Sequence, residues 1–310
     1  MYSIQTVEKV FNNYLDFLLL KNKITTIELI KYKFKNYILP FFGKIKINEI
    51  TEEQYIKFQK ELLKLNFSDS FYEQIHIMMN NFYKYLNIIY KIENIPEKIG
   101  MIKNSHNYVS RQHKDIWTKK EFKKFIKTID DPIYHALFNF LFYTGVRKGE
   151  ALALKITDFK NNYISINKAI TKELYNGSRL ILKPKTKSSN RLIHIDFFMQ
   201  LELKRLIKYY IKKYNNFNNE FFLFGGDKPI ATTTLERKKN NWCKIAKVKQ
   251  IRIHDFRHSH ATMLYNKKIK PKVIQQRLGH ANISTTLNTY VHIGEKEEKR
   301  LIKVINLTRL

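Results

Sequence analysis

Five side chains in the sequence have the types and spacing needed to grip and attack a phosphodiester. His254 and Arg257 lie three residues apart, so on a helix they share a face. His280 follows a Leu-Gly pair, and Tyr290 comes ten residues later. Arg147 stands upstream, within the stretch Thr-Gly-Val-Arg-Lys-Gly-Glu. Arginine forks bind phosphate oxygens in pairs, histidines move protons and a tyrosine hydroxyl can act as a nucleophile. The set suits attack on a phosphodiester by a protein hydroxyl.

Each residue in this set also has a plainer interpretation. A lone His-x-x-Arg pair is typical of a solvated helix face, and a histidine after Leu-Gly is typical of a helix end. One tyrosine among 19 is a poor nucleophile by itself, because its pKa of about 10 requires nearby positive charge and a base. His254, His258 and His260 lie close together, but the glutamate of a His-Glu-x-x-His zinc motif is absent. We therefore expect no metal here.

A basic turn supplies a candidate proton donor. Lys185 lies in Lys-Pro-Lys-Thr-Lys, between two predicted strands, with Lys183 and Lys187 as rivals. At a hairpin tip, its ammonium can reach a leaving oxygen and donate a proton. A solvated turn that binds the DNA backbone would have the same composition. The residues alone leave both interpretations open.

The chain is strongly basic, and its charge is unevenly distributed. Lysine and arginine total 57 against 27 acidic residues, a formal net charge of +30. Residues 1–110 hold 15 lysines against 11 acidic residues, whereas residues 111–310 hold 42 basic against 16 acidic residues. Such charge indicates a polyanionic partner, either nucleic acid or an anionic membrane surface, although a nonspecific basic protein would also carry it. Arginine is scarce, 11 against 46 lysines, so Arg147 and Arg257 within the sharpest motifs are informative.

Cysteine usage and hydropathy indicate a protein that stays inside the cell. Cys243 is the single cysteine, which excludes an intrachain disulfide and a multi-cysteine zinc site. The N-terminus lacks a basic segment followed by an apolar stretch, so we predict no signal peptide. The apolar run over 138–143 is far too short to span a bilayer. We expect a soluble, cytoplasmic protein, nucleoid-associated in a bacterial host and with no membrane partner.

The N-terminal third is predicted to be a bundle of about four helices. One helix is expected over 26–38, ending before Pro40, because the residue before a proline is disfavoured in a helix. Capping boxes that begin at Thr51 and Ser70 each predict the start of a further helix. Little glycine interrupts these helices, which favours compact packing.

The rest of the chain mixes helices with a few short strands. A capping box at Thr118 predicts a new helix, and the helical pattern over 132–154 is interrupted by Gly145. Three strands are predicted next, over 163–170, 179–182 and 191–195, with an Asn-Gly turn between the first two. Helical patterns return over 198–214 and from about 233. The fold class is mainly α with a small antiparallel β-sheet.

Taken in order, these motifs resemble the tyrosine recombinase (phage integrase) family. Thr-Gly-x-Arg-x-x-Glu, Pro-Lys-Thr-Lys-Ser-Ser, His-Asp-x-Arg-His-Ser-x-Ala-Thr, Leu-Gly-His and Thr-x-x-x-Tyr-x-His stand in the family's order and at its spacing. The resemblance implies a helical, SAM-like core-binding domain over 1–95, a linker over 96–113 and an α+β catalytic domain over 114–310. No extra N-terminal domain precedes these, so binding to arm-type sites is not implied.

The resemblance also implies a role for each residue. Tyr290 attacks the scissile phosphate and forms a 3′-phosphotyrosyl bond, while Arg147 and Arg257 hold the nonbridging oxygens. Lys185 protonates the leaving 5′ oxygen. The remaining roles are proton transfer assisted by His254, a phosphate hydrogen bond from His280, orientation of an arginine by Glu150 and support of Tyr290 by His292. The bond energy is kept in the phosphotyrosine, so no cofactor, no ATP and no metal is required.

The implied partner is double-stranded DNA that carries specific recombination sites. Four protomers assemble on two sites in this family, and the segment 295–310 can dock on a neighbour or pack in cis. An excisionase or a host bending protein is compatible with the family but is not visible in the sequence. The lysine-, isoleucine- and asparagine-rich composition suggests a mobile element or phage of a low-GC bacterium.

Three other functions share some of these sequence features. A type IB topoisomerase uses the same catalytic set to relax DNA, but the helical core-binding module favours a recombinase. A nonenzymatic DNA-binding regulator would not need the full set at this spacing. A basic RNA-binding protein should carry aromatic-glycine motifs, which the sequence lacks.

Overall fold

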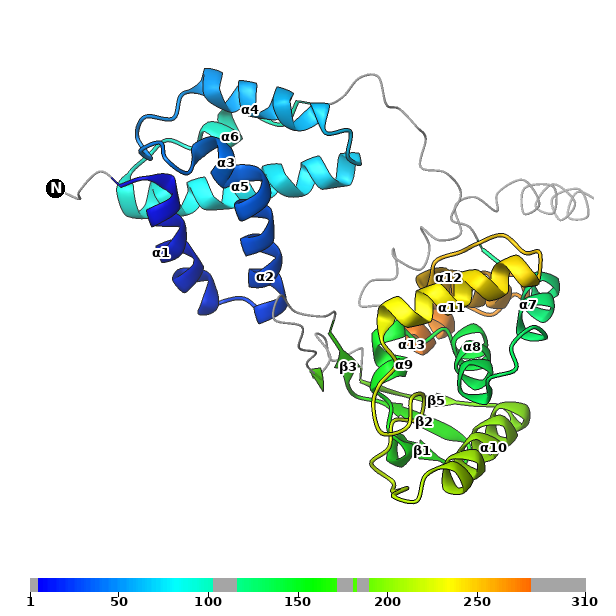
Figure 1. Ribbon diagram of the computed structural model, residues 1–310. Coiled ribbons are helices and arrows are strands. Elements are labelled where there is room, and N and C mark those ends of the chain that lie inside the picture. The colour runs from blue at the N-terminus through cyan, green and yellow to red at the C-terminus, as the bar shows by residue number, and fades with distance from the viewer. Residues whose placement is uncertain (1–4, 103–115, 172–180, 183–189, 280–310) are drawn as a thin grey trace, which may run out of the picture. The chain divides into compact units, whose positions relative to one another are not determined.

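The computed structural model describes residues 5–102, 116–171, 181–182 and 190–279. These residues fall into two compact units, one up to residue 102 and one from residue 116 onward, and each has its own apolar core (Figure 1). The architecture is mainly helical with small antiparallel sheets, as the sequence predicted. Across the described residues, no helix combines the length and apolar character needed to cross a membrane.

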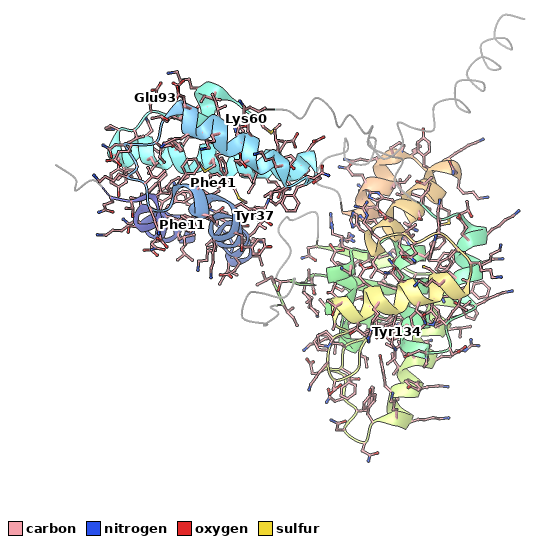
Figure 2. All side chains as sticks on the ribbon, turned by 45° about the horizontal axis from the view of Figure 1, so that its top comes forward. Phe11, Tyr37, Phe41, Lys60, Glu93 and Tyr134 are labelled. Atoms are coloured by element: carbon pink, nitrogen blue, oxygen red, sulfur yellow. The ribbon has the colours of Figure 1, made fainter. Side chains whose placement is uncertain are left out.

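The first unit is a bundle of helices with an aromatic core. Phe11 stacks on Phe34 with ring centroids 4.1 Å apart, and Tyr37 meets Phe71 edge-on at 4.9 Å. Three rings of this unit, Phe11, Tyr37 and Phe41, are labelled in Figure 2. Its elements are α1 (Val7–Leu19), α2 (Ile24–Lys33), the π-helical turn η1 (Phe34–Ile38), α3 (Leu39–Phe42), α4 (Glu52–Lys64), α5 (Asp69–Tyr90) and α6 (Ile95–Ile99).

Two predictions about helix ends in this unit were wrong. The helical path does not end before Pro40: it runs from α2 through η1 and α3 to Phe42. Pro40 lies in the first turn of α3, where its missing N–H is not needed. Ser70 does not cap α5, because Ser68 has the extended backbone of the N-cap and the helix begins at Asp69. The capping box at Thr51 is confirmed.

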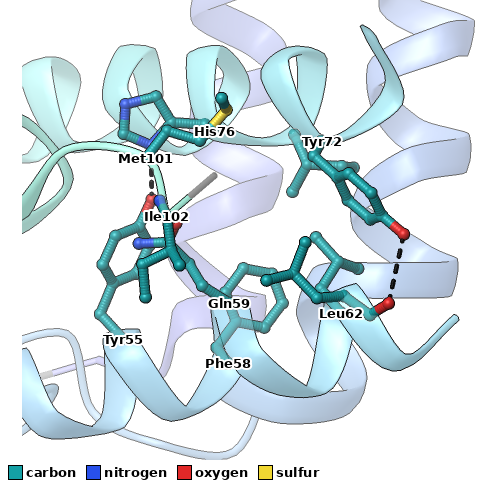
Figure 3. A pocket seen from close by; sticks show the side chains of 10 residues that line it. Tyr55, Phe58, Gln59, Leu62, Tyr72, His76, Met101 and Ile102 are labelled. Atoms are coloured by element: carbon teal, nitrogen blue, oxygen red, sulfur yellow. Dashed lines mark hydrogen bonds between the residues drawn. The ribbon is translucent and has the colours of Figure 1, made fainter. Parts of the chain in front are cut away.

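Residues 96–102, part of the linker predicted from the sequence, contact the first unit. Gln59 on α4 uses its side-chain amide as a peptide group would, donating to the carbonyl of Gly100 at 3.0 Å and accepting from the N–H of Ile102 at 2.7 Å. Gln59 also lines a small pocket together with Tyr55 and His76, whose hydroxyl and Nδ1 are hydrogen-bonded at 2.9 Å (Figure 3). Gln59 therefore ties this part of the chain to α4.

We expect Gln59→Leu to loosen this tie. The substitution leaves the half-buried Ile102 N–H and the Gly100 carbonyl without the amide, which costs about 1–3 kcal/mol locally. Hydrogen exchange of residues 100–102 should accelerate by about tenfold or more. Lys60→Leu changes the neighbouring, exposed position of α4 and should leave that exchange unchanged. Equal exchange in wild type and Gln59→Leu would contradict the assignment.

The second unit is arranged around α8 (Pro132–Thr144). Nine of its 13 residues are buried, because α7 (Lys119–Ile126), α10 (Phe197–Lys213) and α12 (Ile253–Asn266) all pack on it. The capping box at Thr118, which starts α7, is confirmed. Three more helices complete the unit in the described residues: α9 (Lys148–Ala153), α11 (Thr232–Ile245) and α13 (Pro271–Leu278).

Two small antiparallel sheets lie beside these helices. The first has the order β1-β2-β5, and Tyr163 pairs with His194 while Ile166 pairs with Arg191. The second pairs β3 with β4. The strands, with the short 3₁₀ turn that precedes them, are η2 (Ile156–Asp158), β1 (Phe159–Lys160), β2 (Tyr163–Ile166), β3 (Ala169–Ile170), β4 (Ile181–Leu182) and β5 (Arg191–His194). The single strand predicted over 163–170 is therefore two strands in different sheets, and β1 was not predicted.

Candidate active site

The joint between α8 and α9 places Arg147. Gly145 ends α8 in the left-handed conformation at φ +67°, and Arg147 is the N-cap residue of α9. A Cβ on Gly145 would lie 2.7 Å from the ring of His260 and 2.7 Å from a methyl of Leu278. Glycine is required here for its backbone conformation and for this close approach. The interruption predicted at Gly145 is confirmed, and it brings α12 and α13 against the joint.

The carboxylate of Glu150 lies between two arginines from different elements. Arg147 donates to it through its backbone N–H at 3.1 Å and through Nη1 at 2.8 Å. Arg191, the first residue of β5, donates through Nη1 at 3.3 Å and Nη2 at 2.9 Å. Burial works to raise the pKa of Glu150, but the hydrogen bonds and charges of Arg191 and then Arg147 hold this pKa below its ordinary value.

Arg257 meets the same joint from α12. The residue is only 3% exposed, and its Nη1 donates to the carbonyl of Gly145 at 2.9 Å. The helix is held at its start by the buried carboxylate of Asp255, which accepts from the backbone N–H of Arg252 at 2.9 Å and from its guanidinium at 3.0 and 3.1 Å. Arg257 is therefore bonded to a residue that lies only two positions before Arg147 in the sequence.

His254 lies in the first turn of α12, on the side where solvent reaches. Its ring meets that of His258 edge-on, with centroids 5.0 Å apart. Desolvation on its protein side, and then the positive charge of Arg257, lower the pKa of His254 from its ordinary value. The ring is therefore neutral at neutral pH and able to accept a proton. Among the described residues, no group of three or more His, Cys, Asp or Glu side chains could hold a metal ion.

Three residues of this cluster were missed by sequence reasoning: Arg191, Arg277 and His260. Arg277 donates through Nε to His260 Nε2 at 3.2 Å, and through its two Nη atoms to the carbonyls of His194 and Tyr143, each at 3.2 Å. Burial, helped by the charge of Arg277, lowers the pKa of His260 to about 3. The neutral His260 ring accepts from Arg277 on one side and donates from Nδ1 to the Phe142 carbonyl at 2.9 Å on the other.

The last described turn of α13 also contacts the cluster. Gly279 ends the helix in the left-handed conformation, at φ +69°. Its carbonyl accepts from Nη2 of Arg147 at 2.9 Å. Of the predicted site residues, the described part of the structure brings together Arg147, Glu150, His254 and Arg257. The others, Lys185, His280, Tyr290 and His292, lie outside the described residues.

The sequence of residues 116–297 matches the model of the phage integrase family, and residues 6–63 match that of the phage integrase N-terminal SAM-like domain. The chain belongs to the phage integrase family. It is accordingly a tyrosine-type site-specific recombinase, as the motifs led us to expect. The match to the first model includes the four arginines of the site, Arg147, Arg191, Arg257 and Arg277.

Three individual proteins illustrate the similarity to this integrase. The ICEBs1 integrase of Bacillus subtilis is 28% identical over 87% of this chain and 74% of its own length. A tyrosine recombinase of Thermosipho africanus is 26% identical over 96% of this chain and 99% of its own. The Tn1549 transposon integrase, solved in complex with transposon right end DNA, superposes with a TM-score of 0.76 at 21% identity, covering 97% of this chain and all of that one. At that identity the superposition shows the fold alone.

Proposed function

We propose that this integrase breaks and rejoins DNA at specific sites by transferring a DNA 3′-phosphoryl group to the hydroxyl oxygen of Tyr290. The observation that carries the proposal is the meeting of Arg147 and Arg257 at one joint, although they are 110 positions apart in the chain. Guanidinium groups keep their charge at any biological pH, so two of them can hold and neutralise a phosphate. With the charge supplied by arginines, the proposed reaction uses no metal and no cofactor.

The proposed reaction transfers a phosphoryl group and two protons. The Tyr290 oxygen attacks phosphorus, the bond from phosphorus to the 5′ oxygen breaks, and Lys185 supplies the proton that leaves with that oxygen. The ring of His254, which its lowered pKa keeps unprotonated at neutral pH, assists by taking up the tyrosine proton. Rejoining reverses these steps with the 5′-hydroxyl of another strand. The further roles proposed are a phosphate hydrogen bond from His280 and support of Tyr290 by His292.

The end of α13 contacts the proposed site just before His280 in the sequence. The carbonyl of Gly279 accepts from Nη2 of Arg147 at 2.9 Å. This contact between Gly279 and a proposed phosphate-binding arginine supports the role proposed for His280.

We further propose that the chain has a DNA-binding domain over 1–95 and a catalytic domain over 114–310, joined by a linker over 96–113. The first domain would help to hold the DNA, and the second would cut it. Four copies would act on two DNA sites, serving the integration or excision of a mobile element. The similarity to the ICEBs1 integrase and to the Tn1549 transposon integrase supports that use. An excisionase or a host bending protein would be an accessory to it.

The test of this function is to trap and map the covalent intermediate. Nicked DNA from the flanks of the native gene, chosen because the protein binds it, would be incubated with the wild type in EDTA. A denaturing gel should show a protein–DNA adduct, and mass spectrometry of the digested adduct should place the nucleotide on Tyr290. Tight binding without an adduct would favour a DNA-binding protein that does not cut. Relaxation of supercoils without joining of two sites would favour the topoisomerase alternative.

A further inference from the structure

We propose that Arg191 is a positioning residue for the recombination reaction: it clamps Glu150 so that Glu150 holds Arg147 in the orientation that binds the scissile phosphate. This inference rests on the proposed function, because it assigns Arg147 to the phosphate. It adds a residue that lies outside the motifs shared with the family, at the start of β5.

The clamp has two donors on each carboxylate oxygen. Oε1 of Glu150 accepts from Nη1 of Arg147 at 2.8 Å and from Nη1 of Arg191 at 3.3 Å. Oε2 accepts from the backbone N–H of Arg147 at 3.1 Å and from Nη2 of Arg191 at 2.9 Å. A carboxylate held in this way cannot turn about its own axis without breaking a bond to each arginine. The pose of Arg147 is thus fixed by a group that Arg191 fixes.

Arg191 is itself rigidly held. Its side chain is 8% exposed, and its Nε donates to the carbonyl of Arg277 in the last turn of α13 at 2.9 Å. Its backbone is paired with Ile166 of β2. Because Arg147 also donates to Gly279 in that same turn, the two arginines and Glu150 join β5, α9 and the end of α13. A displacement of any of these elements would reach Arg147 through the clamp.

Only an arginine can supply this set of bonds. The position needs three N–H groups in one plane, two for the carboxylate and one for a carbonyl behind it, which the guanidinium fork provides. A lysine ammonium would keep the charge but lose the geometry. The chain uses lysine four times as often as arginine, 46 against 11, so an arginine here departs from its usual choice.

The test separates the chemical step from DNA binding. Single-turnover cleavage and Kd would be measured on the same nicked DNA for Arg191→Met, Arg191→Lys, Glu150→Gln and the double variant Glu150→Gln/Arg191→Met. We expect Arg191→Met to slow cleavage about 10- to 100-fold, because small misplacements of a catalytic group cost about that much, while Kd changes less than about threefold. Arg191→Lys should remain about tenfold slow. In the Glu150→Gln background, removing Arg191 should cost little more.

The pH dependence of the cleavage rate should change if Arg191 acts through Glu150, but not if Arg191 has only a structural role. In the wild type, Arg191 and Arg147 hold the pKa of Glu150 low, so its ionised form persists as the pH falls. Without Arg191, burial raises this pKa, and the cleavage rate of Arg191→Met should fall with acid at a higher pH than that of the wild type. The double variant, which has no carboxylate at 150, should lack this acid limb.

Each remaining outcome has a defined meaning. Arg205→Met makes the same chemical change on the exposed face of α10 and should cleave like the wild type. Normal cleavage by Arg191→Met, or an equal loss with and without Glu150, would overturn the inference and leave the proposed function intact. No adduct with the wild type would overturn both. If tryptophan fluorescence shows that Arg191→Met fails to fold, Arg191→Lys decides by the same measurements.

Discussion

The covalent adduct should be undetectable for Tyr290→Phe, at least about 10³-fold below the wild-type yield. Phenylalanine keeps the ring but lacks the oxygen that would bond to phosphorus, so the covalent step has no nucleophile. The Kd for the nicked DNA should change less than about twofold, since many phosphate contacts contribute to affinity and one uncharged hydroxyl contributes little. Adduct yield on denaturing gels and Kd by titration, both in EDTA, measure the two effects.

A matched variant controls for the loss of a tyrosine hydroxyl. Tyr209→Phe, on α10 of the same unit, removes a hydroxyl that accepts a hydrogen bond from Lys213 at 2.9 Å. It should form the adduct at the wild-type rate. If Tyr290→Phe still forms an adduct, the nucleophile is another of the 19 tyrosines, and the assignment of Tyr290 is wrong.

Local signals in the sequence were enough to place several elements. The capping boxes at Thr51 and Thr118 and the break at Gly145 depend on residues within one helical turn, so short motifs predict them. The antiparallel strands after residue 160 follow from alternating apolar residues. Such signals predicted the mainly helical fold and the small sheets.

Contacts that reach beyond one helical turn decided the elements that were missed. The hydroxyl of Tyr72 accepts from the N–H of Phe67 at 2.6 Å and fixes the entry to α5, where Ser70 was expected to act as the cap. The predicted strand over 163–170 is two strands because β3 separates from the sheet of β2 and packs against α9. Gly149 permits this approach, since a Cβ there would lie 2.8 Å from the carbonyl of Ile170. Neither contact has a local signature.

The same limit applies to the candidate site. His254, Arg257, Arg147 and Glu150 sit in recognisable motifs, but Arg191 bonds to Glu150 across 41 positions, and no motif marks it. Arg277 has partners 17, 83 and 134 positions away. The available signal was the scarcity of arginine in a lysine-rich chain. Had every arginine been treated as a candidate, Arg191 and Arg277 would have been included.

Arg257→Lys should slow single-turnover cleavage by about 10³- to 10⁵-fold, comparable to the loss of an arginine that neutralises charge in other phosphoryl transfers. That range corresponds to about 4–7 kcal/mol of transition-state stabilisation. The guanidinium at 257 donates one N–H to the Gly145 carbonyl, and the proposed function requires its other N–H groups for the phosphate. An ammonium cannot serve both with one geometry, so the positive charge alone does not rescue the reaction. Kd should change by less than about threefold.

Arg252→Lys is the matched control, because Arg252 lies five positions earlier and its side chain is 75% exposed. It should cleave within about threefold of the wild type. Folding is monitored by tryptophan fluorescence, since Trp117 packs edge-on against Phe256, with ring centroids 5.1 Å apart, beside the substituted position. Native fluorescence with normal cleavage by Arg257→Lys would remove this arginine from the phosphate. Native fluorescence with cleavage lost would place its fork, rather than its charge, at the centre of the reaction.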